Sequence, residues 1–156
     1  MQTIRLETMN DAEFGTFFDD LVPSYAAERA LADHVSLEVA QRHVADQLAG
    51  LLPHGRLTEG HSFLRVVQSG SAAWLGSVWY MMENSVRQAF LYNITVFPEH
   101  RRQGIASVAL AQVEERVRLA GYGILGLNVF AHNAGAAALY HKLGFTAVSH
   151  YMNKTL

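Results

Sequence analysis

The stretch Val96-Phe97-Pro98-Glu99-His100-Arg101-Arg102-Gln103-Gly104-Ile105-Ala106 joins two segments with different hydrophobic periods. Before it, residues 90–96 are rich in aromatic and β-branched side chains, a composition that predicts a strand. After it, apolar residues recur at helical spacing from Ile105 to Ala120, which predicts a helix. The first N–H groups of a helix lack partners and form its positive dipole end, so this junction favours an anion such as a phosphate. Gly104 lets the backbone approach that anion without an intervening side chain.

Three strand-like runs lead up to this junction. They cover residues 63–67, 73–81 and 89–97, and polar turns at 69–71 and 83–85 separate them. Strands at hairpin spacing predict an antiparallel meander whose last strand enters the arginine loop directly.

Helical segments are predicted before the meander, after a short first strand at residues 3–7. The residues that mark their boundaries are Asn10 with Glu13 (a capping box), Pro23 (a break or kink), Ser24 (the N-cap of a second short helix to about Ala32), Ser36 (an N-cap) and Pro53 (an end).

The second half of the chain alternates helices and strands. A helix at about 103–120 precedes a buried strand at 124–130, so a parallel crossover is expected. Asn133 caps a further helix that ends at Gly144, and a last strand is predicted from Phe145 to about Asn153. The whole chain, residues 1–156, is therefore expected to form one α/β domain with a mixed, mostly antiparallel sheet and helices on both faces.

Composition narrows the classes of function. The chain has no cysteine, which excludes disulfides and a thiol nucleophile. Its formal net charge is −2 and its only basic run is Arg101-Arg102, so nucleic acid is not an expected partner. No apolar run is long enough to span a bilayer, so a membrane is not an expected partner either. The 8 histidines show no metal-ligand spacing, so no metal site is predicted. Because residues 1–7 lack the apolar core of a signal peptide, a cytoplasmic location is expected.

Two patterns resemble one known family. Arg101-x-x-Gly104-x-Ala106 resembles the Arg/Gln-x-x-Gly-x-Gly/Ala signature of the GNAT superfamily of N-acetyltransferases, whose loop holds the pyrophosphate of acetyl-CoA. Leu127-x-Val129-x-x-x-Asn133-x-x-Ala136-x-x-Leu139-Tyr140-x-x-x-Gly144-Phe145 is similar to the GNAT pattern after the crossover helix. Because both stand in the right order and local structure, the chain is similar to small bacterial GNAT enzymes, including those that acetylate protein N-termini.

The resemblance implies a cosubstrate, acetyl-CoA, and a slot for it between two splayed central strands. It implies that the backbone of Ile94 and Val96 pairs with the pantetheine arm, that Asn133 bonds the pantetheine amide, and that Tyr140 lies beside the sulfur. The residues that it implies at the pyrophosphate are Arg101, Arg102, Gln103, Gly104, Ile105, Ala106 and Ser107.

The reaction implied is direct attack of an amine on the acetyl thioester. The amide N–H of Val96 is expected to stabilise the oxyanion, and the hydroxyl of Tyr140 is expected to act as general acid toward the leaving thiolate. An amine with a pKa of about 10.4 is mostly charged near neutral pH, so a general base or a water chain is also needed.

The base is the part that the sequence leaves unassigned. Asn93, Thr95 and Asn128 occupy positions where relatives often carry a titratable group, and none of them can titrate, although they could order a proton-carrying water. Glu83 is the tentative base, with Tyr92 behind it.

The leading interpretation is an acetyl-CoA-dependent N-acetyltransferase that acts on a small-molecule amine or a peptide N-terminus. The alternative is a non-catalytic acyl-CoA-binding sensor with the same fold, since fold does not fix function. A nucleotide-binding domain is disfavoured because the P-loop lysine and hydroxyl are missing. The acceptor, the range of acyl groups and the choice between monomer and homodimer stay open.

Overall fold

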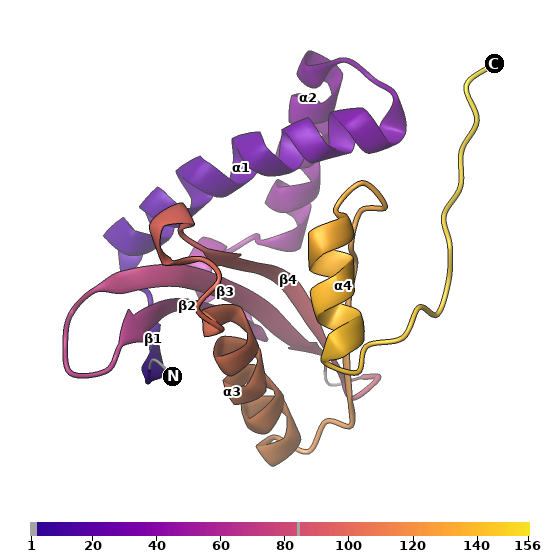
Figure 1. Ribbon diagram of the computed structural model, residues 1–156. Coiled ribbons are helices and arrows are strands. Elements are labelled where there is room, and N and C mark those ends of the chain that lie inside the picture. Colours follow the sequence, from indigo (N-terminus) through magenta and orange to yellow (C-terminus); the bar gives the residue numbers. More distant parts are fainter. Residues whose placement is uncertain (1–2, 84) are drawn as a thin grey trace. The chain divides into compact units, whose positions relative to one another are not determined.

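The computed structural model describes residues 3–83 and 85–156 of the chain (Figure 1). These residues form two compact units, Met1–Phe17 with His54–Asn128, and Phe18–Pro53 with Val129–Leu156. The elements are β1 (Ile4–Thr8), α1 (Asp11–Asp33), α2 (Leu37–Leu51), η1 (Gly55–Leu57), β2 (His61–Gln68), β3 (Trp74–Glu83), β4 (Gln88–Val96), η2 (Pro98–His100), α3 (Ile105–Leu119), β5 (Ile124–Leu127) and α4 (Ala134–Lys142).

The first unit is built on a five-stranded sheet in the order β1-β2-β3-β4-β5. The first four strands pair antiparallel, which confirms the predicted meander. Strand β5 pairs parallel with β4 after the crossover through α3, as expected from the strand–helix–strand order. The prediction of a mixed, mostly antiparallel sheet is confirmed.

Both faces of this sheet are covered within the first unit. On one face, the ring of Phe63 contacts Phe14 and Phe17 in the first turns of α1, with centroid distances of 4.8 and 6.0 Å. Leu64 and Val66 project to the opposite face because side chains alternate along a strand, and both are buried. Helix α3 lies against β1 and β4 and buries an apolar stripe made of Ile105, Ala109, Leu110, Val113 and Val117.

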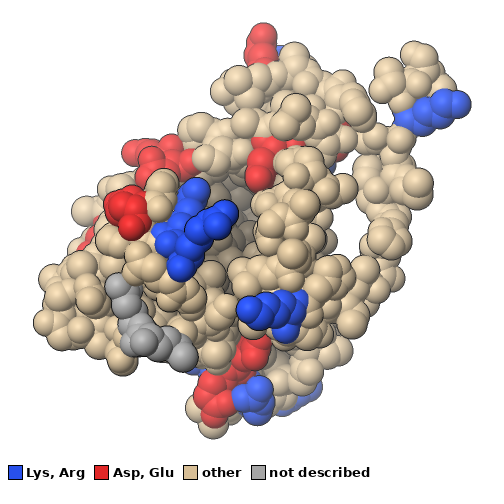
Figure 2. All heavy atoms as spheres, in the orientation of Figure 1, with Lys and Arg blue, Asp and Glu red and all other residues tan. Residues whose placement is uncertain are grey.

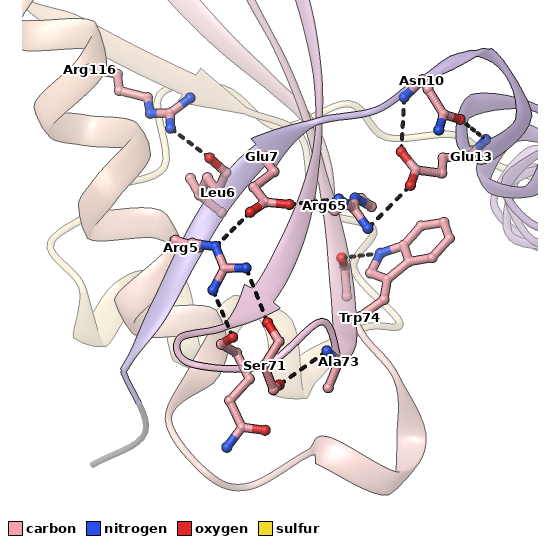
Figure 3. Close-up of polar contacts among 12 residues, drawn as sticks. Arg5, Leu6, Glu7, Asn10, Glu13, Arg65, Ser71, Ala73, Trp74 and Arg116 are labelled. Carbon is pink, nitrogen blue, oxygen red and sulfur yellow. Dashed lines mark hydrogen bonds and ion pairs between the residues drawn. The ribbon is translucent and has the colours of Figure 1, made fainter.

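A polar network fixes the start of α1 against the sheet (Figure 3). Asn10 and Glu13 form the predicted capping box, because each side chain accepts the other residue's backbone N–H at 2.9 Å. Glu13 also pairs with Arg65 at 3.1 Å, and Arg65 pairs with Glu7 at 2.6 Å. One carboxylate therefore both caps α1 and holds it to β2.

The β3–β4 pair carries a bulge and a close backbone approach. Trp79 pairs with Asn93 but Tyr80 pairs with Leu91, which leaves Tyr92 as the extra residue on β4. Further along, a Cβ on Gly76 would overlap the backbone oxygen of Thr95.

Caps define the helices of the second unit. The side chain of Ser36 accepts the N–H of Val39 at the start of α2, as predicted. Asn133 caps α4 in the same way through the N–H of Ala136, and Gly144 follows the helix with a φ of 96°. The sequence therefore located both helix starts correctly.

The predicted break at Pro23 is wrong. Helix α1 continues through Pro23 to Asp33, so Ser24 caps no second helix. Because proline has no backbone N–H, Pro23 cannot donate the helical hydrogen bond to the carbonyl of Asp19, four residues earlier. Both Pro23 and Asp19 are exposed, so water can hydrogen-bond that carbonyl.

Two strand predictions also need correction. Strand β5 ends at Leu127 rather than at residue 130, and it is not fully buried, since Ile124 is 59% exposed. Residues 145–153 form no strand, because a β-like sequence makes a ladder only where a partner strand is present. Of the predicted turn at 83–85, Asn84 lies outside the described residues.

Helices in the described part of the chain are all too short or too polar to cross a membrane. Figure 2 shows acidic and basic side chains in small separate groups on the face drawn, without a broad basic field. No cluster of three metal-ligating side chains occurs among residues 3–83 and 85–156.

Replacing Gly76 by alanine should lower the free energy of unfolding by roughly 1–3 kcal/mol, because the new methyl group would push β3 and β4 apart. Gly50→Ala is the matched control, since nothing lies within 4 Å of that site in α2 and alanine favours a helix. Chemical denaturation of both variants measures the difference; equal stability would contradict the close approach.

Candidate functional site

The loop between β4 and α3 exposes an uncapped helix N-terminus. Gly104 is the N-cap of α3, with a φ of 74°, and no side chain caps the helix. Val108 is the first helical residue to bond back, to the carbonyl of Gly104 at 3.2 Å. The N–H groups of Ile105, Ala106 and Ser107 therefore precede the first helical hydrogen bond and suit an anion.

Two exposed arginines, Arg101 and Arg102, immediately precede this helix start. Residues 101–104 are exposed, and two of them are the arginines of the predicted motif. The Nε of Arg101 donates to the backbone oxygen of Val96 at 2.9 Å, so Arg101 also ties the loop to the end of β4. Arg102 holds a positive φ of 60°, which places the chain in the left-handed region just before Gly104.

Strand β4 has an open edge next to this loop. Its pairing with β5 ends at Leu91, so the segment after Leu91 has no strand on that side among the described residues. The N–H of Phe97 bonds to Leu75 in the β3 direction at 2.9 Å. Because backbone groups alternate along a strand, the N–H and C=O groups of Val96 and Ile94 point away from β3, to the open side.

These features fit a cosubstrate with a diphosphate and an amide-bearing arm. The helix N-terminus and the two arginines supply donors and charge for the diphosphate. The open edge of β4 supplies backbone groups that can pair with amides, as an added strand would. Strand β4 pairs with β5 only as far as Leu91, and β5 itself ends at Leu127. These two facts account for the predicted splay of the central strands.

Two polar side chains on this part of β4, Asn93 and Thr95, are not titratable. The hydroxyl of Thr95 donates to the side-chain oxygen of Asn93 at 3.0 Å. Neither group changes charge near neutral pH, so this pair can orient water but cannot take a proton permanently.

Glu83 lies at the other end of the sheet. It pairs with Gln88, whereas Val96 pairs with Gly76, and a rise of about 3.3 Å per residue puts Glu83 on the order of 26 Å from Val96. Hydrogen bonds from the backbone and hydroxyl of Ser85 lower the pKa of Glu83, which weakens it as a base. This position gives no support to Glu83 as the base.

His61 is a residue whose surroundings the sequence did not reveal. Its Nδ1 accepts the indole N–H of Trp79 at 3.0 Å, and its ring stacks on Tyr92, the bulge residue of β4, with centroids 5.7 Å apart. Because an indole nitrogen only donates, Nδ1 is unprotonated and the neutral ring carries its proton on Nε2. Burial lowers the pKa of His61, so it stays neutral near pH 7. Its only sequence signal is its place at the start of an aromatic-rich strand.

Asn133 and Tyr140 belong to the second unit. The side-chain oxygen of Asn133 is engaged in the helix cap. The ring of Tyr140 contacts Phe145 with centroids 5.7 Å apart, and burial raises the pKa of the Tyr140 phenol, so its hydroxyl keeps its proton at neutral pH. Their predicted roles toward the cosubstrate stay predictions.

Comparisons with known proteins place the chain in a family. The profile of the Acetyltransferase (GNAT) family matches residues 24–145. The N-acetyltransferase YycN of Bacillus subtilis (strain 168), itself described as uncharacterized, is 31% identical over 99% of both chains. Its crystal structure superposes with a TM-score of 0.91. The chain is therefore an acyltransferase. It belongs to the GNAT acetyltransferase family, whose members use acetyl-CoA.

Two further likenesses are more limited. The [ribosomal protein bS18]-alanine N-acetyltransferase of Escherichia coli (strain K12) is 41% identical over 58 residues, which are 37% of this chain and 39% of that protein. The spermidine N-acetyltransferase of Vibrio cholerae, solved with CoA and spermine, shares 15% identity and a TM-score of 0.68 over 98% of this chain and 86% of that one. The second likeness shows a shared fold alone.

Gly104→Asp should lower the affinity for CoA at least tenfold more than Gly104→Asn does. The two side chains have nearly the same shape and both tolerate a positive φ, so the comparison isolates one negative charge at the helix N-terminus. Isothermal titration calorimetry with CoA measures both affinities, and equal losses would contradict anion binding at this loop.

His61 should make the fold less stable as the pH falls. Its pKa is lowered in the folded state, so the unfolded chain binds the proton more tightly and stability is lost below about pH 6.5. His61→Asn removes the titration but keeps an oxygen that can accept the N–H of Trp79. Denaturation at pH 7 and pH 5 should therefore show a smaller loss in the variant; an equal loss would contradict a neutral, buried His61.

Proposed function

We propose that this protein transfers the acetyl group of acetyl-CoA to a primary amine by direct attack. The open edge of β4, which runs into the uncapped N-terminus of α3, is the feature that supports this proposal most directly. It offers a backbone track for an amide-bearing arm and an anion site at the end of that track.

The family pattern suggests which residues would hold the cosubstrate, and the open edge of β4 and the N-terminus of α3 support those that lie in the first unit. Ile94 and Val96 would pair with the pantetheine arm along the open edge, and Asn133 would bond its amide. The pyrophosphate would be bound by Arg101, Arg102, Gln103, Gly104, Ile105, Ala106 and Ser107.

The chemistry asks for two donors from the protein. As the amine nitrogen bonds to the thioester carbon, the carbonyl oxygen becomes an oxyanion, and the N–H of Val96 would stabilise it by about 3–4 kcal/mol. When the carbon–sulfur bond breaks, Tyr140 would give its proton to the thiolate. Burial raises the pKa of the Tyr140 phenol, so the group is protonated at neutral pH and has a proton to give, while the same shift makes it a weaker acid.

The proton lost by the amine needs another route. Asn93 and Thr95 form a hydrogen-bonded pair on β4 that could orient a water beside the attacking amine. We therefore propose that the proton leaves through ordered water rather than through Glu83, whose location and lowered pKa both disfavour it.

The acceptor is proposed as a small-molecule amine or a peptide N-terminus. A stretch of the chain is similar to an enzyme named for acetylating an alanine of ribosomal protein bS18, and the fold is shared with one named for spermidine. A cytoplasmic location, expected from the sequence, stays a prediction.

Release of CoA thiol from acetyl-CoA should depend on the acceptor. A panel of polyamines, aminoglycosides, amino acids and short peptides with varied N-termini would be compared with buffer alone, by a thiol-reactive dye. One class should exceed the background clearly. If the protein binds acetyl-CoA but none of the acceptors raises thiol release above the background, it is instead the acyl-CoA-binding sensor.

Tyr140→Phe should lower kcat by about a hundredfold or more, the usual contribution of a general acid. Acetyl-CoA affinity should stay within a few-fold, because the ring and its contact with Phe145 are kept. Steady-state kinetics and calorimetry separate the two effects. An unchanged kcat in a folded variant would remove Tyr140 from the mechanism.

A further inference from the structure

Two side chains of the first unit have N–H donors that no group in the described part of the chain accepts. The side-chain oxygen of Asn93 accepts the hydroxyl of Thr95 at 3.0 Å, and the amide nitrogen of Asn93 donates to none of residues 3–83 and 85–156. The Nδ1 of His61 accepts the indole N–H of Trp79 at 3.0 Å, which leaves the proton of the neutral ring on Nε2, again without an acceptor among those residues. Asn93 and His61 are both half-buried, so a ligand can reach them.

Both donors lie on one face of the sheet, at the start of the open edge of β4. Asn93 pairs directly with Trp79 across β3 and β4, and side chains that lie directly opposite each other share a face. Trp79 is bound in turn to His61, and the ring of His61 stacks on Tyr92, the neighbour of Asn93, with centroids 5.7 Å apart. Because the pairing of β4 with β5 ends at Leu91, both donors stand beside the first residues of the open edge.

The carboxylates of β1 to β4 are not placed to hold a cationic ligand beside these donors. In β2, β3 and β4, all of whose residues the structure describes, the single carboxylate is Glu83, and it lies at the other end of the sheet. Glu7 of β1 is paired with Arg65, and so is Glu13 at the start of α1. The free polar groups around the start of the open edge are therefore donors, which bind oxygen atoms rather than ammonium groups.

The aromatic rings beside the donors offer little surface to a cation. Trp79 stacks on Phe63 and on Tyr92, with centroids 5.1 and 4.5 Å apart. Phe63 and Trp79 are only 2% and 3% exposed. Cation–π binding needs a ring face that the cation can approach, so this cluster does not favour a polyamine.

We propose that the acceptor is an α-amino carbonyl compound, such as a peptide N-terminus or an amino-acid amide, and that its carbonyl oxygen accepts an N–H of the Asn93 side chain. The Nε2 proton of His61 binds a second oxygen further along the same acceptor. This inference rests on the proposed transfer of an acetyl group to a primary amine, and it names the class of that amine. Asn93 has two N–H donors, so one can hold the acceptor while the other orients water.

The ionisation of the amine favours the same class. An α-amino group has a pKa of about 7.7–8.0, so roughly one molecule in ten is neutral at pH 7. An alkyl amine with a pKa of about 10.4 has only about one neutral molecule in 2,500. Asn93 and Thr95 cannot titrate, so an amine that loses its proton readily to water suits this part of β4 better than one that needs a strong base.

Glycinamide and propargylamine make a matched pair of acceptors for a first test. Both are small primary amines of similar basicity, and only glycinamide has a carbonyl group. The rate of CoA thiol release at a fixed pH would give kcat/KM for each, with spermidine as a third acceptor. Glycinamide should exceed propargylamine at least tenfold, because propargylamine leaves the Asn93 donor without an acceptor.

A tripeptide amide that begins with glycine distinguishes the two sources of the α-amino carbonyl group. A higher kcat/KM for the tripeptide than for glycinamide would identify a peptide N-terminus, because only the peptide has a second carbonyl for His61. A lower value would identify a free amino-acid derivative. Either result supports the shared chemistry.

Asn93→Asp tests the donor directly. This change keeps the shape of the side chain but replaces its N–H groups by an oxygen that repels the carbonyl, so the ratio of glycinamide to propargylamine should fall to about one. Asn10→Asp is the matched control, because it adds the same charge at the exposed N-cap of α1, where aspartate caps as well as asparagine does. The control should keep the wild-type ratio.

The outcomes separate this inference from the proposed function. Thiol release that does not favour glycinamide over propargylamine in the wild type, or a ratio that Asn93→Asp leaves unchanged, would overturn the choice of acceptor and leave acetyl transfer standing. Release with none of the acceptors would overturn the proposed function and this inference with it. The wild-type comparison decides the matter even if Asn93→Asp fails to fold.

Discussion

The site depends on the separation of β4 from β5 after Leu91. If the two strands stayed paired beyond Leu91, the backbone N–H and C=O groups of Ile94 and Val96 would form hydrogen bonds with β5. None of these groups would then be available to a ligand. Because β5 ends at Leu127, the rest of β4 keeps one edge unpaired, and the bulge at Tyr92 falls just where this unpaired edge begins. An unpaired strand edge is a liability in most proteins, and here it is the surface that suits an extended cosubstrate.

The anion site is attached to the same strand. Arg101 donates to the carbonyl of Val96, so the loop that precedes α3 is fixed to the end of the open edge. Helix α3 is in turn anchored across the sheet, since Gln112 and Arg116 donate to backbone oxygens of Ile4 and Leu6 at 2.9 and 3.0 Å. The position of the helix dipole is thus set by contacts made far from the loop itself, in agreement with the idea that rigid elements place functional groups.

Several titratable side chains on β1, β2 and the start of α1 are already bound by other residues of the fold, so they do not serve as the missing base. Arg65 binds both Glu7 and Glu13, so these carboxylates serve the fold. His61 is engaged by Trp79 and presents a hydrogen-bond donor rather than a base. On β4 itself, Asn93 and Thr95 form a hydrogen-bonded pair that is neutral at all ordinary pH values.

Local signals determined much of this protein. Alternation, helical spacing, the caps at Asn10, Ser36 and Asn133, and the motif from Arg101 to Ala106 are properties of neighbouring residues, so the sequence alone predicted the meander, the crossover and the anion loop. The end of β5, the continuous α1 and the unpaired residues 145–153 were decided by tertiary structure. A strand exists only where a second strand supplies its hydrogen bonds, and an exposed proline is tolerated where water can replace the bond that it removes. Such partners are distant in sequence, and no local pattern records them.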